Sequence, residues 1–464
     1  MHHVEQAIEY VHSRKQALID SWLELVRVPS VSAQPEHAGD MAAAAQWLEQ
    51  RLGRSGFDCR ICDSGGHPAV FAGRCNLDGA LTVLVYGHYD VQPPGDQRLW
   101  DSPPFKPAVR DGAVFGRGAA DDKGQLLTAV AAVEAWQAVS GELPVNVKFL
   151  LEGEEEIGSP HLPSLVESHQ NELACDVVLI CDTAAFKPGV PAITYGTKGL
   201  VYKEVTLTGP AKDLHSGSFG GTVANPANVL AEVIASLKDA DGRVTIPGFY
   251  DDVQPLGEAE RASLAALRFD EVAYLAQLGS PALAGEPGCS TLERRWTRPT
   301  LDVNGLSAGY QGQGASTIIP ARASAKISMR LVPRQDPEAV SASFNRVVRQ
   351  VCGDRVRAQI TEHGLCRPYM APLDSPWMGA ARRALAAGFG REPVLIREGG
   401  TLPILPVFKE VLGADCLLLG YCRPDCNAHG PNEFFHIEDF LAGAVTGVRL
   451  LAELAGLYGP TVRG

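Results

Sequence analysis

The stretch LTVLVYGHYD at residues 81–90 decides the fold. Its first six residues are apolar or β-branched, which is typical of a strand buried on both faces of a parallel sheet. His88 and Asp90 follow at the carboxyl end, where open α/β sheets bind ligands, and their spacing puts both side chains on one side. A histidine held in one tautomer by a carboxylate can bind a metal. On this stretch alone, a capped strand end with a satisfied core histidine is the alternative.

The composition is that of a globular protein, with 45% hydrophobic and 20% charged residues. A chain of 464 residues is too long for one ordinary core, so we expect two domains. The net charge of -13 argues against nucleic acid as a partner, because phosphate binding needs clustered Lys and Arg. We expect no signal peptide, and no membrane partner, because no apolar run approaches the roughly 20 residues that span a bilayer.

The eleven cysteines are scattered along the chain and odd in number. We interpret them as reduced thiols of a cytoplasmic protein. Cys422 and Cys426 could begin a zinc site, but no second pair of cysteines matches them.

Two adjacent aspartates lie in the segment GRGAADDKG, residues 116–124. A helical pattern begins at about Gln125, so Asp121 and Asp122 are expected at or just before a helix N-terminus. Capping that helix would be a sufficient role for one of them. Two carboxylates this close repel each other, and a nearby cation would relieve the repulsion.

Two further buried strands are predicted to end in acidic residues. Residues 145–151 are followed by four glutamates between residues 152 and 156, and residues 176–181 are followed by Asp182. A run of glutamates is usually a solvated surface, but this run follows a buried strand. Three apolar strands that each end in His, Glu or Asp predict one site built on a rigid sheet.

The sequence pattern changes at residue 198. Half-exposed strands and helices between 198 and 361 predict a smaller α+β domain inserted in the chain, so that residues 1–197 and 362–464 form the larger domain. For the larger domain we predict an α/β fold with a mixed, mostly parallel sheet flanked by helices.

The candidate metal ligands come from these strand ends and from the segment NAHGPNE at 427–433. They are His88, Asp121, Glu155 or Glu156, Asp182 and His429. Two imidazoles and three carboxylates suit zinc or manganese, and five ligands fit two metals that share one carboxylate. Two such metals polarise a carbonyl and hold a hydroxide, while a further carboxylate takes the proton of the water. The residues therefore predict hydrolysis of an amide or ester.

Five motifs in this order resemble the co-catalytic zinc exopeptidases, which include carnosinase, bacterial dipeptidases, aminoacylase and succinyl-diaminopimelate desuccinylase. The motifs are GHYDV at 87–91, residues 116–124, residues 152–159, Asp182, and AHG at 428–430. The resemblance covers nearly the whole chain. It implies that the larger domain is catalytic and that the inserted domain is a lid through which subunits dimerise.

The resemblance assigns a role to each candidate at the metal site. It implies that His88 and Asp182 bind one metal and that Glu156 and His429 bind the other. Asp121 would bridge both metals, and its peptide bond to Asp122 would be cis. Asp90 would orient the imidazole of His88, and Glu155 would be the general base.

The resemblance also implies substrate contacts in and beside the lid. His215, in DLHSG at 213–217, would reach the active site of the partner subunit and stabilise the oxyanion. Arg330 would grip a substrate carboxylate, a task that suits a bidentate guanidinium. Further contacts are expected from Thr317, Gly399, Gly400 and Thr401.

Together these features predict a metal-dependent dipeptidase that cleaves small peptides with a free C-terminal carboxylate. Within the resemblance, dipeptidase-like members carry Asp where this chain has Asp182, whereas desuccinylases and glutamate carboxypeptidases carry Glu. We expect two divalent metal ions per subunit, with zinc preferred and manganese or cobalt as alternatives, and a homodimer formed through the lid. An N-acyl-amino-acid amidohydrolase is the alternative enzyme, and a non-catalytic peptide-binding protein is the alternative from another class.

Overall fold

The computed structural model describes residues 2–457, which form two compact units. Unit 1 comprises Met1–Tyr195, Ala371–Ile396 and Val407–Gly464, and unit 2 comprises Gly196–Met370 and Arg397–Pro406. The sequence predicts a return to the larger domain at residue 362, but the structure makes this return nine residues later, at Ala371. The reason is that β14 (Arg357–Cys366) stays paired with a strand of unit 2 as far as Cys366.

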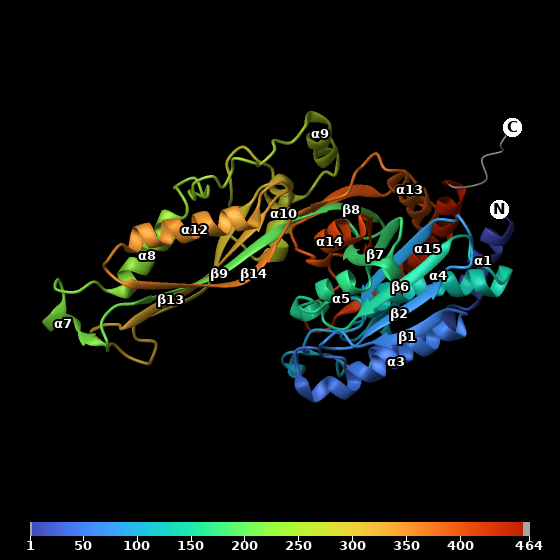
Figure 1. The fold of residues 1–464 in the computed structure, drawn as a ribbon, viewed down its shortest axis with the longest axis horizontal. Coiled ribbons are helices and arrows are strands. Elements are labelled where there is room, and N and C mark those ends of the chain that lie inside the picture. Colours follow the sequence, from blue (N-terminus) through green and yellow to red (C-terminus); the bar gives the residue numbers. More distant parts are fainter. Residues whose placement is uncertain (1, 458–464) are drawn as a thin grey trace. The chain divides into compact units, whose positions relative to one another are not determined.

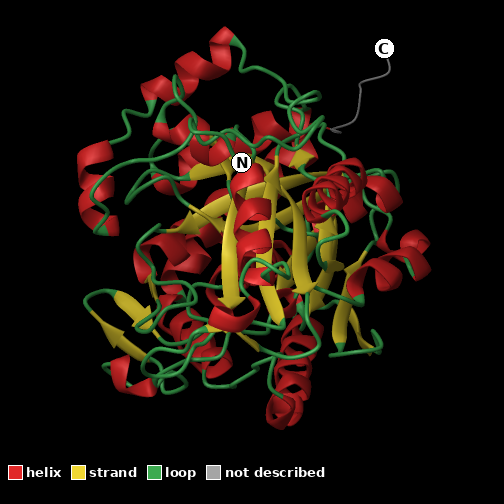
Figure 2. Ribbon diagram, turned by 90° about the vertical axis from the view of Figure 1, so that its left-hand side faces the viewer, coloured by secondary structure: helices red, strands yellow, loops and turns green. Residues whose placement is uncertain are grey.

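A mixed sheet forms the centre of unit 1 (Figure 2), in the order β1-β2-β6-β3-β7-β17-β8. Its strands are β1 (Asp58–Cys62), β2 (Ala69–Arg74), β3 (Thr82–His88), β6 (Asn146–Glu152), β7 (Val177–Ala184), β8 (Ala192–Thr197) and β17 (Asp415–Cys422). The structure confirms the predicted mixed sheet with flanking helices. The central strands β6, β3, β7 and β17 pair in parallel, whereas the pairs β1–β2, β2–β6 and β17–β8 are antiparallel.

The helices of unit 1 bury its sheet. They are α1 (His2–Ser13), α2 (Lys15–Val26), α3 (Ala38–Arg54), α4 (Lys123–Ser140), α5 (Leu162–Ser168), α6 (Gln170–Leu173), α13 (Pro376–Phe389) and α15 (Ile437–Leu457). The α4 helix contacts β3 and β7, α13 and α15 contact β17, and α3 contacts β1 and β2. Val83, Leu84 and Val85 of β3 are buried in succession, as expected for a strand covered on both faces.

By length and composition alone, the α15 helix is long and apolar enough to span a membrane, which the sequence did not lead us to expect. A core helix of a globular protein can be equally long and apolar, and 61% of the apolar stretch of α15 is buried inside the structure. The helix packs against α4 and α13 in unit 1. The sequence pattern predicts a terminal helix from Ile437 to about Tyr458, and Tyr458 lies outside the described residues.

Unit 2 is built on a four-stranded antiparallel sheet in the order β11-β13-β9-β14. Its main elements are β9 (Gly199–Thr208), α8 (Pro226–Ser236), α9 (Glu258–Ala266), α10 (Glu271–Leu278), α11 (Thr291–Trp296), β11 (Thr300–Ala308), β13 (Arg322–Leu331) and α12 (Pro337–Cys352). Along β9, buried and half-buried residues alternate, so one face of the sheet is covered. Figure 1 shows α8 and α12 along this sheet, and their apolar side chains share a core with it.

Further short elements lie outside the two larger sheets. A small antiparallel ribbon in unit 1 joins β4 (Ala108–Arg110), β5 (Ala113–Phe115) and β18 (Phe434–His436). In unit 2, β10 (Leu214–His215) pairs with β12 (Ile318–Ile319), and the one-turn helix α7 (Ser216–Phe219) follows β10.

Candidate active site

Three neighbouring strands of unit 1 bring the predicted metal ligands to one edge of the sheet. His88 is the last residue of β3, which pairs in parallel with β6 and β7. Glu155 and Glu156 lie in a one-turn 3-10 helix just after β6, and Asp182 lies near the end of β7. Because the carboxyl ends of parallel strands meet at the same edge, these side chains converge, as the strand pattern predicts.

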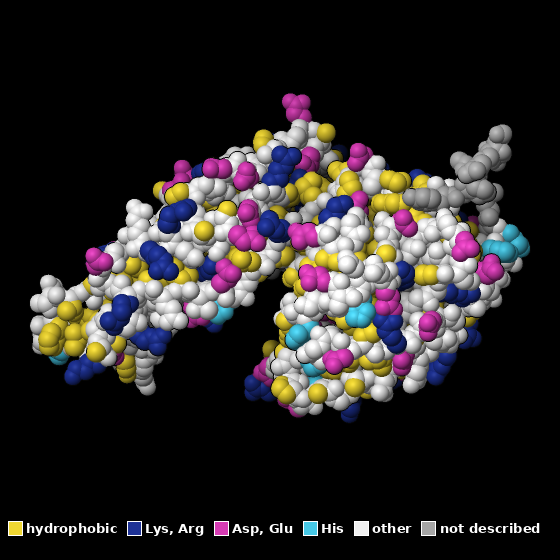
Figure 3. Space-filling view, in the orientation of Figure 1, with side chains coloured by type: hydrophobic (Ala, Val, Ile, Leu, Met, Phe, Trp, Pro, Cys, Tyr) yellow, Lys and Arg dark blue, Asp and Glu magenta, His cyan; other side chains and the backbone are white. Residues whose placement is uncertain are grey.

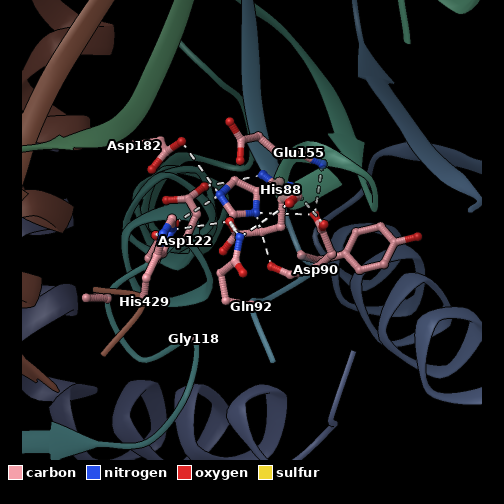
Figure 4. Close-up of polar contacts among 12 residues, drawn as sticks. His88, Asp90, Gln92, Gly118, Asp122, Glu155, Asp182 and His429 are labelled. Atoms are coloured by element: carbon pink, nitrogen blue, oxygen red, sulfur yellow. Dashed lines mark hydrogen bonds and ion pairs between the residues drawn. The ribbon is translucent and has the colours of Figure 1, made fainter. Parts of the chain in front are cut away.

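The buried His88 ring contacts acidic groups through both of its nitrogens (Figure 4). Its Nε2 lies 3.1 Å from Oδ1 of Asp121 and 3.6 Å from Oδ2 of Asp182. Its Nδ1 lies 3.1 Å from the main-chain oxygen of Asp90 and 3.3 Å from the carboxylate of that residue. Burial alone would lower the pKa of His88, but hydrogen bonds to Asp121, Asp182 and Asp90 raise it well above its usual value. The ring is therefore fixed in orientation.

Asp90 has a second contact that the sequence did not suggest. Its carboxylate accepts main-chain N–H groups of Glu155 and Glu156 at 3.2 and 3.1 Å. The same side chain therefore touches the His88 ring and anchors the turn that carries both glutamates. Fixing several groups at once is what a pre-organised site requires.

Asp121 is shared between two clusters of potential ligands. Its Oδ1 faces His88, and its Oδ2 lies 2.9 Å from Nε2 of His429, which in turn lies 3.2 Å from Oε2 of Glu156. Asp121 lies two residues before α4, which begins at Lys123, and its peptide bond to Asp122 is cis, as the resemblance implies. Asp122 is buried and accepts the His88 main-chain N–H at 3.3 Å, away from the shared carboxylate.

His429 belongs to a loop between β17 and β18. It adopts a left-handed backbone conformation with φ of 61°, as do Asn427 and Asn432 in the same loop. This conformation is uncommon for non-glycine residues, although Asn, Asp and His adopt it more readily than others. Glu156 has a further partner that sequence reasoning did not identify: Nε2 of Gln92 donates to its Oε2 at 2.8 Å.

Two groups of residues in the described part of the chain could each hold a metal ion: His88, Asp121 and Asp182, and Asp121, Glu156 and His429. Within each group the ligand atoms lie within 4.8 Å of one another. Imidazole nitrogens and carboxylate oxygens are the donors that zinc and manganese accept. A cation also fits the electrostatics, because burial together with the charges of Asp121 and Glu156 raises the pKa of Asp182 to about 6. The residues present therefore fit two divalent metals that share Asp121.

Glu155 differs from both neighbouring glutamates in its contacts. Within residues 2–457, no hydrogen bond or ion pair holds its carboxylate, whereas Glu156 is held by Gln92 and His429. Burial and the nearby carboxylates raise the pKa of Glu155 well above its usual value, although His88 acts in the opposite direction. The Glu155 carboxylate is thus free to exchange protons beside the two candidate metal positions.

Glu154 points into a different environment from Glu155. Its Oε1 accepts the main-chain N–H of His67 at 3.1 Å, and its Oε2 lies 2.9 Å from Nδ1 of His161. The side chain of Glu154 is therefore occupied by contacts outside the metal-ligand clusters.

In unit 2, Arg330 contacts a chain of polar groups. Its Nη1 donates to the hydroxyl of Thr401 at 2.6 Å, and that hydroxyl donates to the main-chain oxygen of Lys198 at 2.7 Å. The main-chain N–H of Lys198 donates to the oxygen of Gly400 at 3.0 Å, and Gly399 donates its N–H to Glu398 at 2.6 Å. Arg330, Thr401, Gly400 and Gly399 thus lie in one region of unit 2.

Lys198 adds a cation to this region that the sequence did not single out. Its side chain is buried, and burial together with the charge of Arg330 lowers its pKa to about 8. Two cations near a partly buried surface would favour an anionic ligand.

His215 and Thr317 are neighbours at another place in unit 2. The N–H of Ser216, next to His215, donates to the main-chain oxygen of Thr317 at 2.9 Å. The His215 side chain is exposed, and its Nδ1 accepts the main-chain N–H of Gly217 at 3.0 Å. The structure therefore brings His215 and Thr317 together, which are two of the lid residues for which the resemblance implies a contact with substrate.

Comparison with known proteins places this fold and site in a family. The chain is similar to the Cys-Gly metallodipeptidase DUG1 of Saccharomyces cerevisiae, at 32% identity over 96% of this chain and 97% of that protein. It is also similar to the human Beta-Ala-His dipeptidase, at 32% identity over 98% and 93% of the two chains. Among solved structures, the M20 family metallo-carboxypeptidase Sso-CP2 from Sulfolobus solfataricus matches with a TM-score of 0.87 and 34% identity, over 95% and 99% of the two chains.

The family comparison gives the same result for most of the sequence. Residues 84–453 match peptidase family M20/M25/M40, and this range includes every candidate metal ligand described above. Together with the mixed sheet and the two metal-ligand groups, this match identifies the enzyme class as metallopeptidase. The chain belongs to peptidase family M20/M25/M40.

Proposed function

We propose that this protein hydrolyses the peptide bond of dipeptides or short peptides at a centre of two divalent metal ions. One observation carries the proposal: two three-residue ligand groups share Asp121, and the uncommitted Glu155 carboxylate lies in the same cluster of charges. The relatives support the substrate class, since both are named as dipeptidases. His88 and Asp182 would hold one ion, Glu156 and His429 the other, and Asp121 both.

Several residues of the site have separate tasks in this reaction. When bound, two divalent ions polarise the scissile carbonyl and lower the pKa of water. Glu155 takes a proton from the attacking water and returns it to the leaving amine. Asp90 keeps the His88 ring in place and fixes the turn that carries Glu155. Gln92 holds the Glu156 carboxylate in its orientation.

The proposed function is tested by restoring metals to stripped protein. Metal-free protein should not hydrolyse a panel of dipeptides, and zinc, manganese or cobalt added back should restore turnover. We propose zinc as the preferred ion, and the comparison of the three metals tests that choice. Turnover of N-acetyl amino acids but of no dipeptide would instead indicate an amidohydrolase. Binding of dipeptides without any turnover would indicate a peptide-binding protein.

Arg330 should select peptides with a free C-terminal carboxylate. We expect Arg330→Ala to raise the KM for free dipeptides by about 10-fold or more, since a charge-assisted hydrogen bond contributes about 1.5–3 kcal/mol. Amidated dipeptides lack the carboxylate, so their kcat/KM should change little. Steady-state kinetics on paired free and amidated substrates gives the answer.

A matched control for this prediction lies on the same strand. Arg322, at the other end of β13, is exposed, and Arg322→Ala should leave both substrate classes unchanged. Equal losses on free and amidated dipeptides in Arg330→Ala would contradict the role of Arg330 as a carboxylate clamp.

We propose that the protein is a homodimer formed through unit 2 and that His215 completes the site of the partner subunit. Exposed apolar side chains near α7 support an interface there: Phe219 is 44% exposed and Val223 is 42% exposed. Figure 3 shows hydrophobic side chains gathered over this end of unit 2. An oxyanion donor supplied across the interface would explain why His215 lies on an exposed ribbon.

Mixing two inactive variants tests this arrangement. His215→Ala and Glu155→Gln homodimers should each be nearly inactive, but a mixed dimer holds one site with both native residues. Dissociation and re-association of an equimolar mixture should therefore recover up to about one quarter of wild-type activity, because half the dimers are mixed and each has one intact site. Recovery no greater than the sum of the separate variants would indicate a site complete within one chain.

We propose that the protein works in a reducing compartment such as the cytoplasm. The eleven cysteines all lie in the described residues, and all are free thiols in the structure. Disulfides persist mainly in oxidising compartments. Thiol titration of denatured protein purified without reductant should detect all eleven, and stable disulfides would count against this location.

A further inference from the structure

Glu433 is a fully buried carboxylate that the proposed reaction does not use. Its Oε2 accepts Nη1 of Arg117 at 2.7 Å and the main-chain N–H of Gly118 at 2.9 Å. Its Oε1 accepts the main-chain N–H groups of Ala120 and Asp121 at 2.8 and 3.0 Å. Each oxygen therefore has two donors, and one donor is the peptide group of the residue shared by both metal groups.

Arg117 extends this network to the loop of His429. It is 1% exposed, and its Nη2 donates to the main-chain oxygen of Gly430 at 3.1 Å. Gly430 directly follows His429, so Arg117 fixes the backbone beside one ligand while Glu433 fixes the backbone of another. The main chain adds a third link, because the N–H of Gly116 donates to the oxygen of Glu433 at 2.9 Å.

The network joins two segments that are more than 300 residues apart in the sequence. One is the loop before α4, which carries Asp121, and the other is the left-handed loop that carries His429. The pairing of β5 with β18 holds the outer ends of the same two segments. Between these anchors lies the 2.9 Å contact of Asp121 with His429, so a change in the network would change that contact.

An ion pair that only stabilises the fold is the alternative interpretation. Burying two charges carries a desolvation penalty, and well-packed apolar side chains often replace such a pair without loss of stability. Stabilisation of the fold alone therefore does not explain why a buried ion pair lies at this position. The hydrogen bonds of Glu433 to the loop of Asp121 cannot be made by an apolar side chain, and they fix the position of the shared carboxylate.

We propose that Glu433, together with Arg117, is a positioning residue that sets the placement of Asp121 relative to His429 and thereby the affinity for the metal held by His429. This inference rests on the proposed dinuclear site. Partners that orient metal ligands from outside typically change metal affinity by about 10- to 100-fold when they are replaced.

The test measures metal binding directly, in competition with a chromophoric chelator and zinc alone. Glu433→Gln is nearly isosteric, but whichever way its amide lies, the NH₂ group faces two donors and breaks two hydrogen bonds. We expect one zinc to bind about 10- to 100-fold more weakly while the other zinc keeps most of its affinity. Arg117→Lys keeps the charge but not the fork that reaches both Glu433 and Gly430, so it should weaken the same zinc by a smaller factor.

A matched control separates positioning from stability. Arg51 and Glu134 form another partly buried ion pair in unit 1, at 2.9 Å, away from the metal ligands. Glu134→Gln should lower the melting temperature of the metal-free protein but leave both zinc affinities unchanged. If Glu433→Gln does not fold, Arg117→Lys and its zinc affinities provide the test.

The outcomes distinguish the two proposals. Wild-type protein that binds two zinc ions, with variants at Glu433 or Arg117 that bind both as tightly, would overturn the positioning role and leave the proposed function intact. Wild-type protein that binds no zinc would overturn the dinuclear site and this inference with it. Selective weakening of one zinc, with the control unaffected, supports the inference.

Discussion

Replacing Glu155 with Gln is expected to lower kcat by about 10²- to 10⁴-fold while leaving both metal ions bound, since general acid–base catalysis contributes about this much. The amide cannot take the proton of the attacking water, but it keeps the size of the side chain. No hydrogen bond or ion pair of the described residues is lost, because none holds the Glu155 carboxylate. Steady-state kinetics with dipeptides, combined with metal analysis of the purified variant, measures both effects.

Glu154→Gln is the matched control for this prediction. Glu154 precedes Glu155 in the sequence, but its carboxylate contacts His67 and His161. A Gln at this position keeps an oxygen that can accept the His67 N–H, so kcat should remain within a few-fold of the wild type. Loss of activity in Glu154→Gln together with normal activity in Glu155→Gln would show that Glu154, and not Glu155, is the base. Loss of bound metal in Glu155→Gln would show that Glu155 acts as a ligand.

The edge of the sheet could be predicted from sequence because its signals are local. An apolar run marks β3, and the polar residues that follow must lie at its carboxyl end. The same reasoning applies to β6 and β7, and parallel pairing then brings the three ends together. Only the resemblance, however, gave Glu155 and Glu156 separate roles, because adjacent glutamates carry the same local signal.

The contacts that fix the site were not predictable in the same way. Gln92 is 64 residues from Glu156, and Glu433 is 312 residues from Asp121. No periodicity or composition signals such pairs, because they depend on how loops pack after the sheet has formed. The end of unit 2 was missed for a related reason: β14 continues along β9 beyond Thr361, and strand boundaries depend on the partner strand.

Asp90 shows that the site depends on contacts beyond those of the metal ligands themselves. Its side chain contacts the His88 ring and also the backbone of both glutamates. A ligand of one proposed metal, a ligand of the other and the proposed base therefore depend on one buried carboxylate. Sequence spacing suggested the contact with His88, whereas the contact with the turn required the structure.

Asp121→Asn should abolish binding of both metal ions, whereas His88→Ala should mainly weaken one. Asp121 belongs to both ligand groups, and each of its oxygens faces a different histidine. An amide offers one neutral oxygen in place of two charged ones, so one metal loses a ligand and the other loses the bridging charge. Loss of a direct ligand should exceed the about 100-fold change in affinity seen for outer contacts. Zinc stoichiometry and competition titrations measure this difference.

The neighbouring aspartate provides the control for this last prediction. Asp122 belongs to neither ligand group, and Asn at that position keeps an oxygen to accept the His88 N–H. Asp122→Asn should therefore retain two zinc ions, whereas Asp121→Asn should retain none at micromolar zinc. Circular dichroism must first show that both variants are folded, because Asp121 also balances the charges of His88 and His429 when metal is absent. Folded Asp121→Asn protein that still binds two zinc ions with wild-type affinity would contradict a shared carboxylate, and two separate mononuclear sites would then have to explain the two ligand groups.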